Sequence, residues 1–240
     1  MILDRRKAEG EDTSWPGFRL RGSEVTRLES FSDAVFGFAI TLLVVSLDVP
    51  RTFKELFAVM RGFPAFAICF LFLALIWNAH YKFCRRFGLQ DGWTRFLTCL
   101  LLFVVLFFVY PLKFLFNLSI TSHFFGGPNG PAVTKASQYA RLMVTYGLGF
   151  AAVYTAMLLL YARAYRLRDV LELSQLEKFD TRYQIYRLLI LIGVGLLAAV
   201  VAGQRILLVW SGVVYMLIGL LMRIANALHR KQRRRVESRR

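Results

Sequence analysis

The chain has 240 residues, of which 57% are hydrophobic and only 19% are charged. A soluble domain of this length does not need repeated apolar runs of about 20 residues, the length that crosses a bilayer. Such runs recur along the chain, at 31–49, 60–80, 96–116, 142–162, 185–203 and 206–222. The sequence therefore predicts an all-α polytopic membrane protein with six transmembrane helices.

The net charge of +16 is placed unevenly along the chain. Of the 31 Lys and Arg residues, 24 lie in the segments 1–27, 82–95, 163–187 and 223–240. In a chain with six spans these segments fall on the same side of the membrane. Because short cytoplasmic loops carry the excess of Lys and Arg, we expect both termini to be cytoplasmic.

Three parts of the chain differ in composition. Residues 1–26 form a polar arm without an apolar signal core, so we expect it to stay on the chain as a cytoplasmic segment. Residues 27–226 form the six-span domain, and residues 227–240 form a basic cytoplasmic tail. The tail can attract anionic lipid head groups, at about 1 kcal/mol per basic residue, or simply stop the last span and stay solvated. It has no aromatic or base-reading side chains, so we expect no nucleic-acid partner.

The spans contain few residues that could catalyse a reaction or bind a metal. Apart from Asp33 and Asp48 they hold almost no carboxylate, and the three histidines are far apart in sequence. His80 and Cys84 have the i,i+4 spacing of two metal ligands on a helix, but closed sites need four. We therefore expect no enzyme activity, no cofactor and no bound metal beyond ions in transit.

One polar cluster precedes the apolar part of the first span: Arg27, Phe31, Ser32 and Asp33. Ionisable groups at membrane depth cost about 2.5–3.5 kcal/mol each on insertion scales, so they are rarely present without a function. Arg27 and Asp33 are six residues apart, too far round a helix to meet. Each needs a partner on another helix or in water, and His80 of the second span is a candidate.

A stripe along the first span is the second signal. At 100° per residue, one narrow face collects Phe31, Ala34, Phe38, Thr41 and Val45. Four such helices around an axis would form apolar rings with a ring of threonine hydroxyls between them. Apolar rings can gate by dewetting, and oxygens can replace part of the water shell of a cation. Helical spacing alone favours a plain packing seam over a pore lining, and both interpretations stay open.

Asp33 does not share this stripe. It points roughly 140° away from Phe38 on the same helical wheel. Asp33 is therefore expected to be a structural partner within the bundle rather than a residue of an ion filter.

Arg27-x-x-x-Phe31-Ser32-Asp33, opening the first of six spans, resembles the transmembrane protein 175 family of potassium channels. The following residues, Asp33-Ala-Val-Phe-Gly-Phe-Ala-Ile-Thr41, also look like that family. The resemblance implies a channel without a carbonyl filter, in which each first span lines a central pore. A single six-span repeat resembles the prokaryotic members, which implies a homotetramer in the plasma membrane.

The resemblance also assigns roles to residues. It implies that Phe38 forms the pore constriction, that the Thr41 ring contributes to selectivity, and that Val45 adds an apolar layer. Phe38 departs from the aliphatic residue that the family usually has there. The motif residues would hold the pore helix, and the residues that look like their family partners are Trp77 and His80.

The sequence thus predicts a potassium-selective channel that conducts K⁺ passively past a hydrophobic constriction on the first helix. The alternative is a small proton- or cation-coupled secondary transporter that uses Arg27, Asp33 and His80 as a relay. Transporters usually show internal repeats, and we find none. A structural or lipid-binding role would depend on the basic tail alone.

Overall fold

The computed structural model describes residues 17–22, 24–45, 51–120, 136–204 and 208–237. The elements in these ranges are helices, which confirms the predicted all-α class. They are α2 (Arg27–Val45), α3 (Phe53–Arg61), α4 (Phe63–Phe87), α5 (Gly92–Ile120), α6 (Ala136–Arg166), α7 (Gln175–Gly203) and α8 (Leu208–Glu237).

Four of the described helices are long and apolar enough to cross a membrane: Phe63–Phe87, Gly92–Leu115, Ser137–Arg166 and Gln175–Gly203. The chain is therefore a multi-pass membrane protein. Each of the six apolar runs overlaps one long helix, although residues 46–49 and 206–207 lie outside the described ranges. The full topology of six spans, which adds α2 and α8, stays a prediction.

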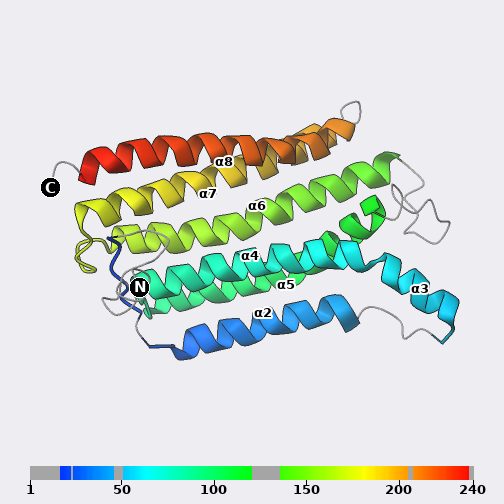
Figure 1. Ribbon diagram of the computed structural model, residues 1–240, viewed down its shortest axis with the longest axis horizontal. Helices are drawn as coiled ribbons and strands as arrows, with labels where there is room; N and C mark the ends of the chain where they lie inside the picture. Colours follow the sequence, from blue (N-terminus) through cyan, green and yellow to red (C-terminus); the bar gives the residue numbers. More distant parts are fainter. Residues whose placement is uncertain (1–16, 23, 46–50, 121–135, 205–207, 238–240) are drawn as a thin grey trace, which may run out of the picture.

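The long helices lie side by side and form a bundle, with short α3 at one end (Figure 1). Helix α2 lies at one edge and packs against α4 and α5, and α6 follows. Helix α7 packs on α6, and α8 packs on α7 at the opposite edge. We call the end where α4, α6 and α8 finish and α2, α5 and α7 begin the basic end, because most of the described Lys and Arg residues gather there.

A group of aromatic rings fills the bundle near the basic end. The rings of Phe83, Phe87 and Tyr161 lie 5.3–5.7 Å apart by their centroids and join α4 to α6. Phe18, from the predicted N-terminal arm, adds an edge-on contact with Phe87 at 5.8 Å and is fully buried. Each such pair contributes about 0.5–1.5 kcal/mol beyond its buried area. The part of the arm that the structure describes therefore packs on the bundle.

Helices α6 and α7 approach each other through two glycines. A Cβ added to Gly147 would lie 2.7 Å from the carbonyl oxygen of Gly195. Without side chains at these positions, the two backbones come into direct contact, the usual role of small residues between membrane helices. Among the described helices, α6 and α7 also share the most extensive contact.

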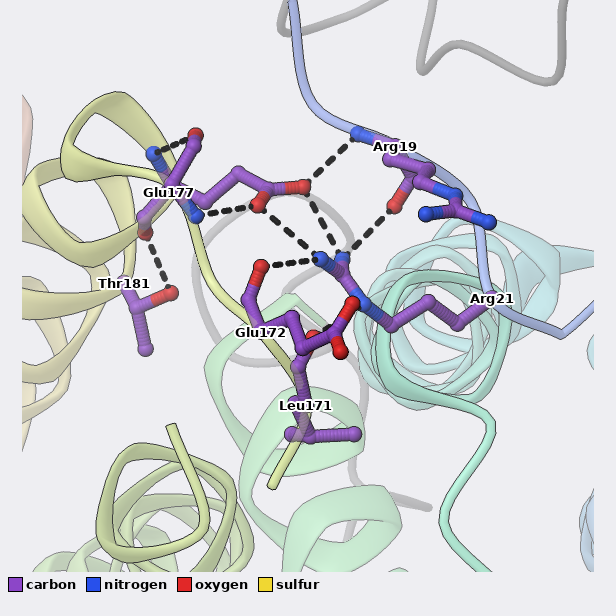
Figure 2. A network of polar contacts seen from close by, with 7 residues as sticks. Arg19, Arg21, Leu171, Glu172, Glu177 and Thr181 are labelled. Carbon is purple, nitrogen blue, oxygen red and sulfur yellow. Dashed lines mark hydrogen bonds and ion pairs between the residues drawn. The ribbon is translucent and has the colours of Figure 1, made fainter. Parts of the chain in front are cut away.

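An ion pair ties the arm to the start of α7 (Figure 2). The Arg21 guanidinium donates to both carboxylate oxygens of Glu177, at 2.9 and 3.0 Å, in the two-pronged geometry that favours arginine. Glu177 is only 3% exposed, and its carboxylate also accepts the backbone N–H groups of Arg19 and Ser174. The Ser174 hydroxyl in turn accepts the Glu177 N–H, which makes a capping box at the first turn of α7.

The same arm is bound to the end of α4. The backbone N–H groups of Arg21 and Gly22 both donate to the Arg85 carbonyl, at 3.1 and 3.0 Å. A Cβ on Gly22 would lie 2.6 Å from the Cys84 carbonyl oxygen, so only glycine allows this approach. The Arg21 side chain further donates to the Leu171 carbonyl at 2.9 Å. Residues 17–22 thus join α4 to α7 directly ahead of α2.

A second ion pair holds α8 against α7. Asp180 is fully buried, and its carboxylate lies 2.9 Å from Nε2 of His229 and 3.2 Å from the Arg233 guanidinium. The His229 ring stacks on Tyr183 at 3.8 Å. Helix α8 continues to Glu237, so this part of the predicted tail is helical and bound to the bundle.

A third contact joins the α4–α5 loop to the end of α6. Asp91 accepts a hydrogen bond from Thr94 and lies 2.9 Å from the Arg163 guanidinium. Partial burial acts to raise the pKa of Asp91, but the hydrogen bonds from Thr94 and Arg163 outweigh it and hold the pKa below its ordinary value. This carboxylate therefore stabilises the fold at neutral pH, and its contribution is lost only as the pH falls through the lowered pKa.

The Arg21–Glu177 pair gives the first testable prediction. Replacing one partner of a buried ion pair leaves the other charge buried and uncompensated, which costs about 3 kcal/mol. We expect Arg21→Met to lower the free energy of unfolding by about this amount and to lower Tm in a detergent thermal-unfolding assay. Glu172→Gln is the matched control, because Arg21 contacts only the backbone carbonyl of Glu172. Equal Tm values for Arg21→Met and the unchanged chain would contradict the prediction.

Candidate functional site

Helix α2 has one buried face and one open face. The buried face packs against α4 and α5 and consists of Glu29, Ser32, Phe36, Ala39 and Leu43. The open face carries exposed residues that we call the α2 stripe: Phe31, Ala34, Phe38 and Thr41. At 100° per residue, the two faces are centred about 160° apart. The stripe is therefore directed away from the rest of its own subunit.

The start of α2 is held by its own polar residues. The Thr26 hydroxyl accepts the Glu29 backbone N–H at 3.1 Å, as a helix-capping side chain does. Ser32 is fully buried, and its hydroxyl donates to the Leu28 carbonyl one turn earlier at 2.8 Å. This bond allows a polar residue of the motif to lie in the packed face of α2.

Asp33 lies on the flank of α2, between the buried face and the stripe. Its Oδ1 accepts a hydrogen bond from the indole Nε1 of Trp77 on α4, at 2.7 Å. The Trp77 ring is itself stacked on Tyr81, with centroids 5.8 Å apart. Because one acceptor and one donor join two helices, this bond fixes both the rotation and the height of α2 against α4.

The other predicted partner of the motif lies behind α2. His80 is 1% exposed, and its ring centre is 6.3 Å from that of Phe36 on the buried face. Its ring nitrogens lie 3.8–3.9 Å from Sγ of Cys84. The structure thus brings Asp33 to Trp77, while His80 contacts the back of the helix through Phe36, a contact that the sequence did not indicate.

Arg27 begins the helix at the basic end, and its side chain is exposed. Within the described ranges it makes no ion pair with Asp33 or another carboxylate. The four residues of the motif thus divide between three surroundings: Ser32 in the core, Asp33 against α4, and Arg27 and Phe31 open. Phe31 is 53% exposed.

The stripe combines a large apolar ring with an oxygen. Phe38 is 59% exposed. One turn on, the Thr41 hydroxyl donates its proton to the Phe38 carbonyl at 2.7 Å. The lone pairs of that hydroxyl are left to face outward, where they can accept hydrogen bonds or coordinate a cation. Val45 ends α2, and its side chain lies outside the described part of the structure.

A lysine holds the other end of α2. The Lys113 ammonium, on α5, donates to the Leu43 carbonyl at 2.8 Å. Carbonyls in the last turn of a helix have no partner within it and carry partial negative charge, so a cation there is favourable. This contact between Lys113 and Leu43 was not predicted from the sequence. A single charged residue inside the apolar run 96–116 is the signal that could have suggested it.

Comparison with known proteins identifies the family to which the chain, including α2, is similar. Residues 27–108 match the family described as "Endosomal/lysosomal potassium channel TMEM175". A potassium channel of Marivirga tractuosa is 40% identical over 234 residues, which cover 92% of this chain and 94% of the relative. The chain belongs to the TMEM175 family. A potassium channel of Streptomyces collinus is 28% identical over 141 residues, which cover 55% of this chain and 64% of the relative.

A solved TMEM175 structure shares the fold. It is a crystal structure of a variant of the potassium channel MtTMEM175 in complex with a nanobody–MBP fusion protein. The two chains are 38% identical, with a TM-score of 0.79 over 90% of this chain and 98% of the other. The family membership expected from Arg27-x-x-x-Phe31-Ser32-Asp33 is therefore confirmed, and with it a function that involves no chemical step.

The Asp33–Trp77 bond gives the second prediction. Trp77→Phe keeps an aromatic ring but removes the N–H donor, so we expect a lower Tm and a loss of about 1 kcal/mol in the free energy of unfolding. Hydrogen exchange in α2 should also become faster. Trp93→Phe is the matched control, because Trp93 is 63% exposed on α5. If both variants shift Tm equally, the indole bond does not hold α2.

Proposed function

We propose that this chain is a potassium channel that conducts K⁺ passively through a central pore lined by α2 of four identical subunits. The observation that carries the proposal is the stripe of Phe31, Ala34, Phe38 and Thr41, which α2 leaves open while its opposite face is buried. Among the residues that the structure describes, none packs against this face. In a tetramer with a fourfold axis beside α2, the same face of the other three α2 helices would lie around that axis. The potassium-channel names of the relatives support this proposal.

The proposed constriction is a ring of Phe38 side chains. Four such rings narrow the path to an apolar neck, which closes when water leaves it. The Thr41 oxygens one turn on accept a partly dehydrated cation, since their own protons are held by the Phe38 carbonyls. Val45 would add a second apolar layer further along the pore.

The motif residues are proposed to anchor this pore helix. Asp33 fixes the rotation of α2 through Trp77, while Ser32 and His80 fill the interface behind it. A rotation of α2 by one residue would move Phe38 about 100° away from the pore axis. The position of the constriction thus depends on these anchoring contacts rather than on the stripe itself.

We further propose six spans with the basic end in the cytoplasm and the protein in a prokaryotic plasma membrane. Helix α8 finishes at the same end of the bundle as α2 begins (Figure 1), and most of the described Lys and Arg residues belong to the segments at that end. This asymmetry is typical of a cytoplasmic side. Residues 1–26, 27–226 and 227–240 remain our division into arm, channel and tail, and the tail faces anionic lipid head groups.

The transporter alternative is not favoured. It requires Arg27, Asp33 and His80 to exchange a proton or an ion, yet no hydrogen bond links the three within the described ranges. His80 is buried behind α2, and Asp33 is occupied by Trp77. The relatives named as potassium channels point the same way.

The direct test is ion flux. Purified protein in liposomes loaded with K⁺ should release it down its gradient when a protonophore balances the charge, at a rate linear in the gradient. Empty vesicles give the baseline. Release at that baseline would contradict the channel, and saturable flux coupled to a second solute would support the transporter.

Phe38 gives a prediction about the constriction. Phe38→Ala removes the ring that narrows the pore, so we expect a higher single-channel conductance in planar bilayers. Phe107→Ala is the control, since Phe107 is 70% exposed on α5 and off the α2 stripe. Currents of the Phe38 variant equal to those of the control would place the constriction elsewhere.

Thr41 gives a prediction about selectivity. Thr41→Val has the same shape but no oxygen, so the K⁺ to Na⁺ permeability ratio should fall. Thr41→Ser keeps the hydroxyl and should keep most of that ratio. Reversal potentials under asymmetric K⁺ and Na⁺ measure this permeability ratio in both variants. If the ratio falls equally in the serine and valine variants, selectivity does not depend on the hydroxyl oxygen.

A further inference from the structure

A pocket separate from α2 lies between α4, α6, α7 and α8. Its volume is about 340 Å³, within the range of sites that hold small molecules. Helix α6, which lies between α4 and α7 (Figure 1), contributes Tyr154 and Met157. The walls are α4 on one side and the α7–α8 pair on the other. Nothing in the proposed ion path uses this pocket.

The lining changes from apolar to cationic towards the basic end. On α4 it begins with Leu75, passes Lys82 and ends at Arg86, a rise of about 16 Å along the helix. Helix α7 starts at the basic end, so its order is reversed, with Arg187 first and Leu191 deeper. The two walls therefore show the same gradient, with charge near the membrane surface and hydrocarbon further in.

Two cations that line this pocket, Lys82 and Arg187, have no acid partner among the described residues, and no carboxylate lines the pocket. Arg86 also lines it, with its guanidinium 5.4 Å from the centre of the Phe18 ring. The Nε of Arg187 is buried and has no hydrogen-bond partner among the described residues, while its NH1 donates to Gln184 at 3.3 Å. A buried donor of this kind costs free energy unless an acceptor reaches it. The pocket thus lacks an anion at its charged end.

We propose that this pocket binds an anionic phospholipid from the leaflet at the basic end. The phosphate lies between Lys82 and Arg187, and an acyl chain follows Leu191 and Ile218 towards the bilayer centre. Basic pockets between membrane helices bind such head groups. A helix of a second copy fits less well, because the spans of this chain hold almost no carboxylate to offer. The site differs from the basic tail, since none of its lining residues belongs to 227–240.

Lipid binding to the purified full-length protein tests the proposal, by native mass spectrometry with phosphatidylglycerol or phosphatidylcholine as the probe. We expect tighter binding of phosphatidylglycerol. The double variant Lys82→Gln/Arg187→Gln should raise its Kd about thirtyfold, the change that two lost contacts of the usual size at an anionic surface produce. Arg95→Gln/Arg223→Gln removes the same charge from exposed positions of α5 and α8 outside the pocket, and should leave Kd unchanged.

A second variant separates the pocket from general charge attraction. Leu191→Trp keeps every cation but fills the apolar part, so it should also weaken phosphatidylglycerol binding. Circular dichroism and gel-filtration elution show whether each variant is folded. Equal affinity for both lipids, equal loss in the control, or full binding by Leu191→Trp would each overturn the proposal.

A photo-crosslinker identifies the occupant directly. Benzoylphenylalanine at Ile218, which lines the apolar part, should give a product heavier by one phospholipid when the protein is illuminated in phosphatidylglycerol vesicles. A product of two protein chains would assign the pocket to a second copy and overturn the proposal. None of these measurements depends on K⁺ flux, so the channel and the lipid site can fail independently.

Discussion

The packing of α2 against α4 and α5 is the constraint on which the rest of the molecule depends. Phe36, Ala39 and Leu43 fill that interface, and the helix can bury them only with its opposite side turned outward. Polar contacts then fix the helix at three heights: the arm at its start, the indole of Trp77 one turn in, and the ammonium of Lys113 at its end. The exposed stripe is a result of these contacts, since no residue in the described ranges packs on the side where it lies.

The polar contacts at the basic end share a physical logic. Each joins elements that lie far apart in sequence, and each leaves few charges unmatched at the membrane edge. Arg21 with Glu177 joins the arm to α7, Asp180 with His229 joins α7 to α8, and Asp91 with Arg163 joins α5 to α6. Losing one partner of a buried pair costs more free energy than the intact pair contributes. We therefore infer that the two buried pairs, Arg21–Glu177 and Asp180–His229, act chiefly to specify one arrangement of the helices. The pocket between α4, α6, α7 and α8 is the exception, because Lys82 and Arg187 line it without an acid partner among the described residues.

Much of the fold could be predicted from the sequence, because apolar runs long enough to cross a bilayer are visible without a structure. Their ends could not, since helices continue through the head-group region into charged residues, as α8 does to Glu237. Helical periodicity grouped Phe31, Ala34, Phe38 and Thr41 on one face but did not show whether that face is packed or open. Periodicity also left open which helix faces the flank with Asp33, and Trp77 was suggested only by the family resemblance. Arg21 and Glu177 are 156 residues apart, and their pairing was not predicted; the capping-box spacing of Ser174 and Glu177 is the signal that could have drawn attention to Glu177.

The hydrogen bond of the Thr41 hydroxyl determines which sign of charge the open face of α2 attracts. Its proton is committed to the Phe38 carbonyl, so the group facing outward is electron-rich yet formally neutral. In the proposed tetramer, a ring of such oxygens would repel anions and attract cations without a single carboxylate. Phe31, Ala34, Phe38 and Thr41 also contain no group that gains or loses a proton at cellular pH. The proposed ion path along this face would therefore keep its preference for positive ions whether the surrounding solution is acidic or alkaline.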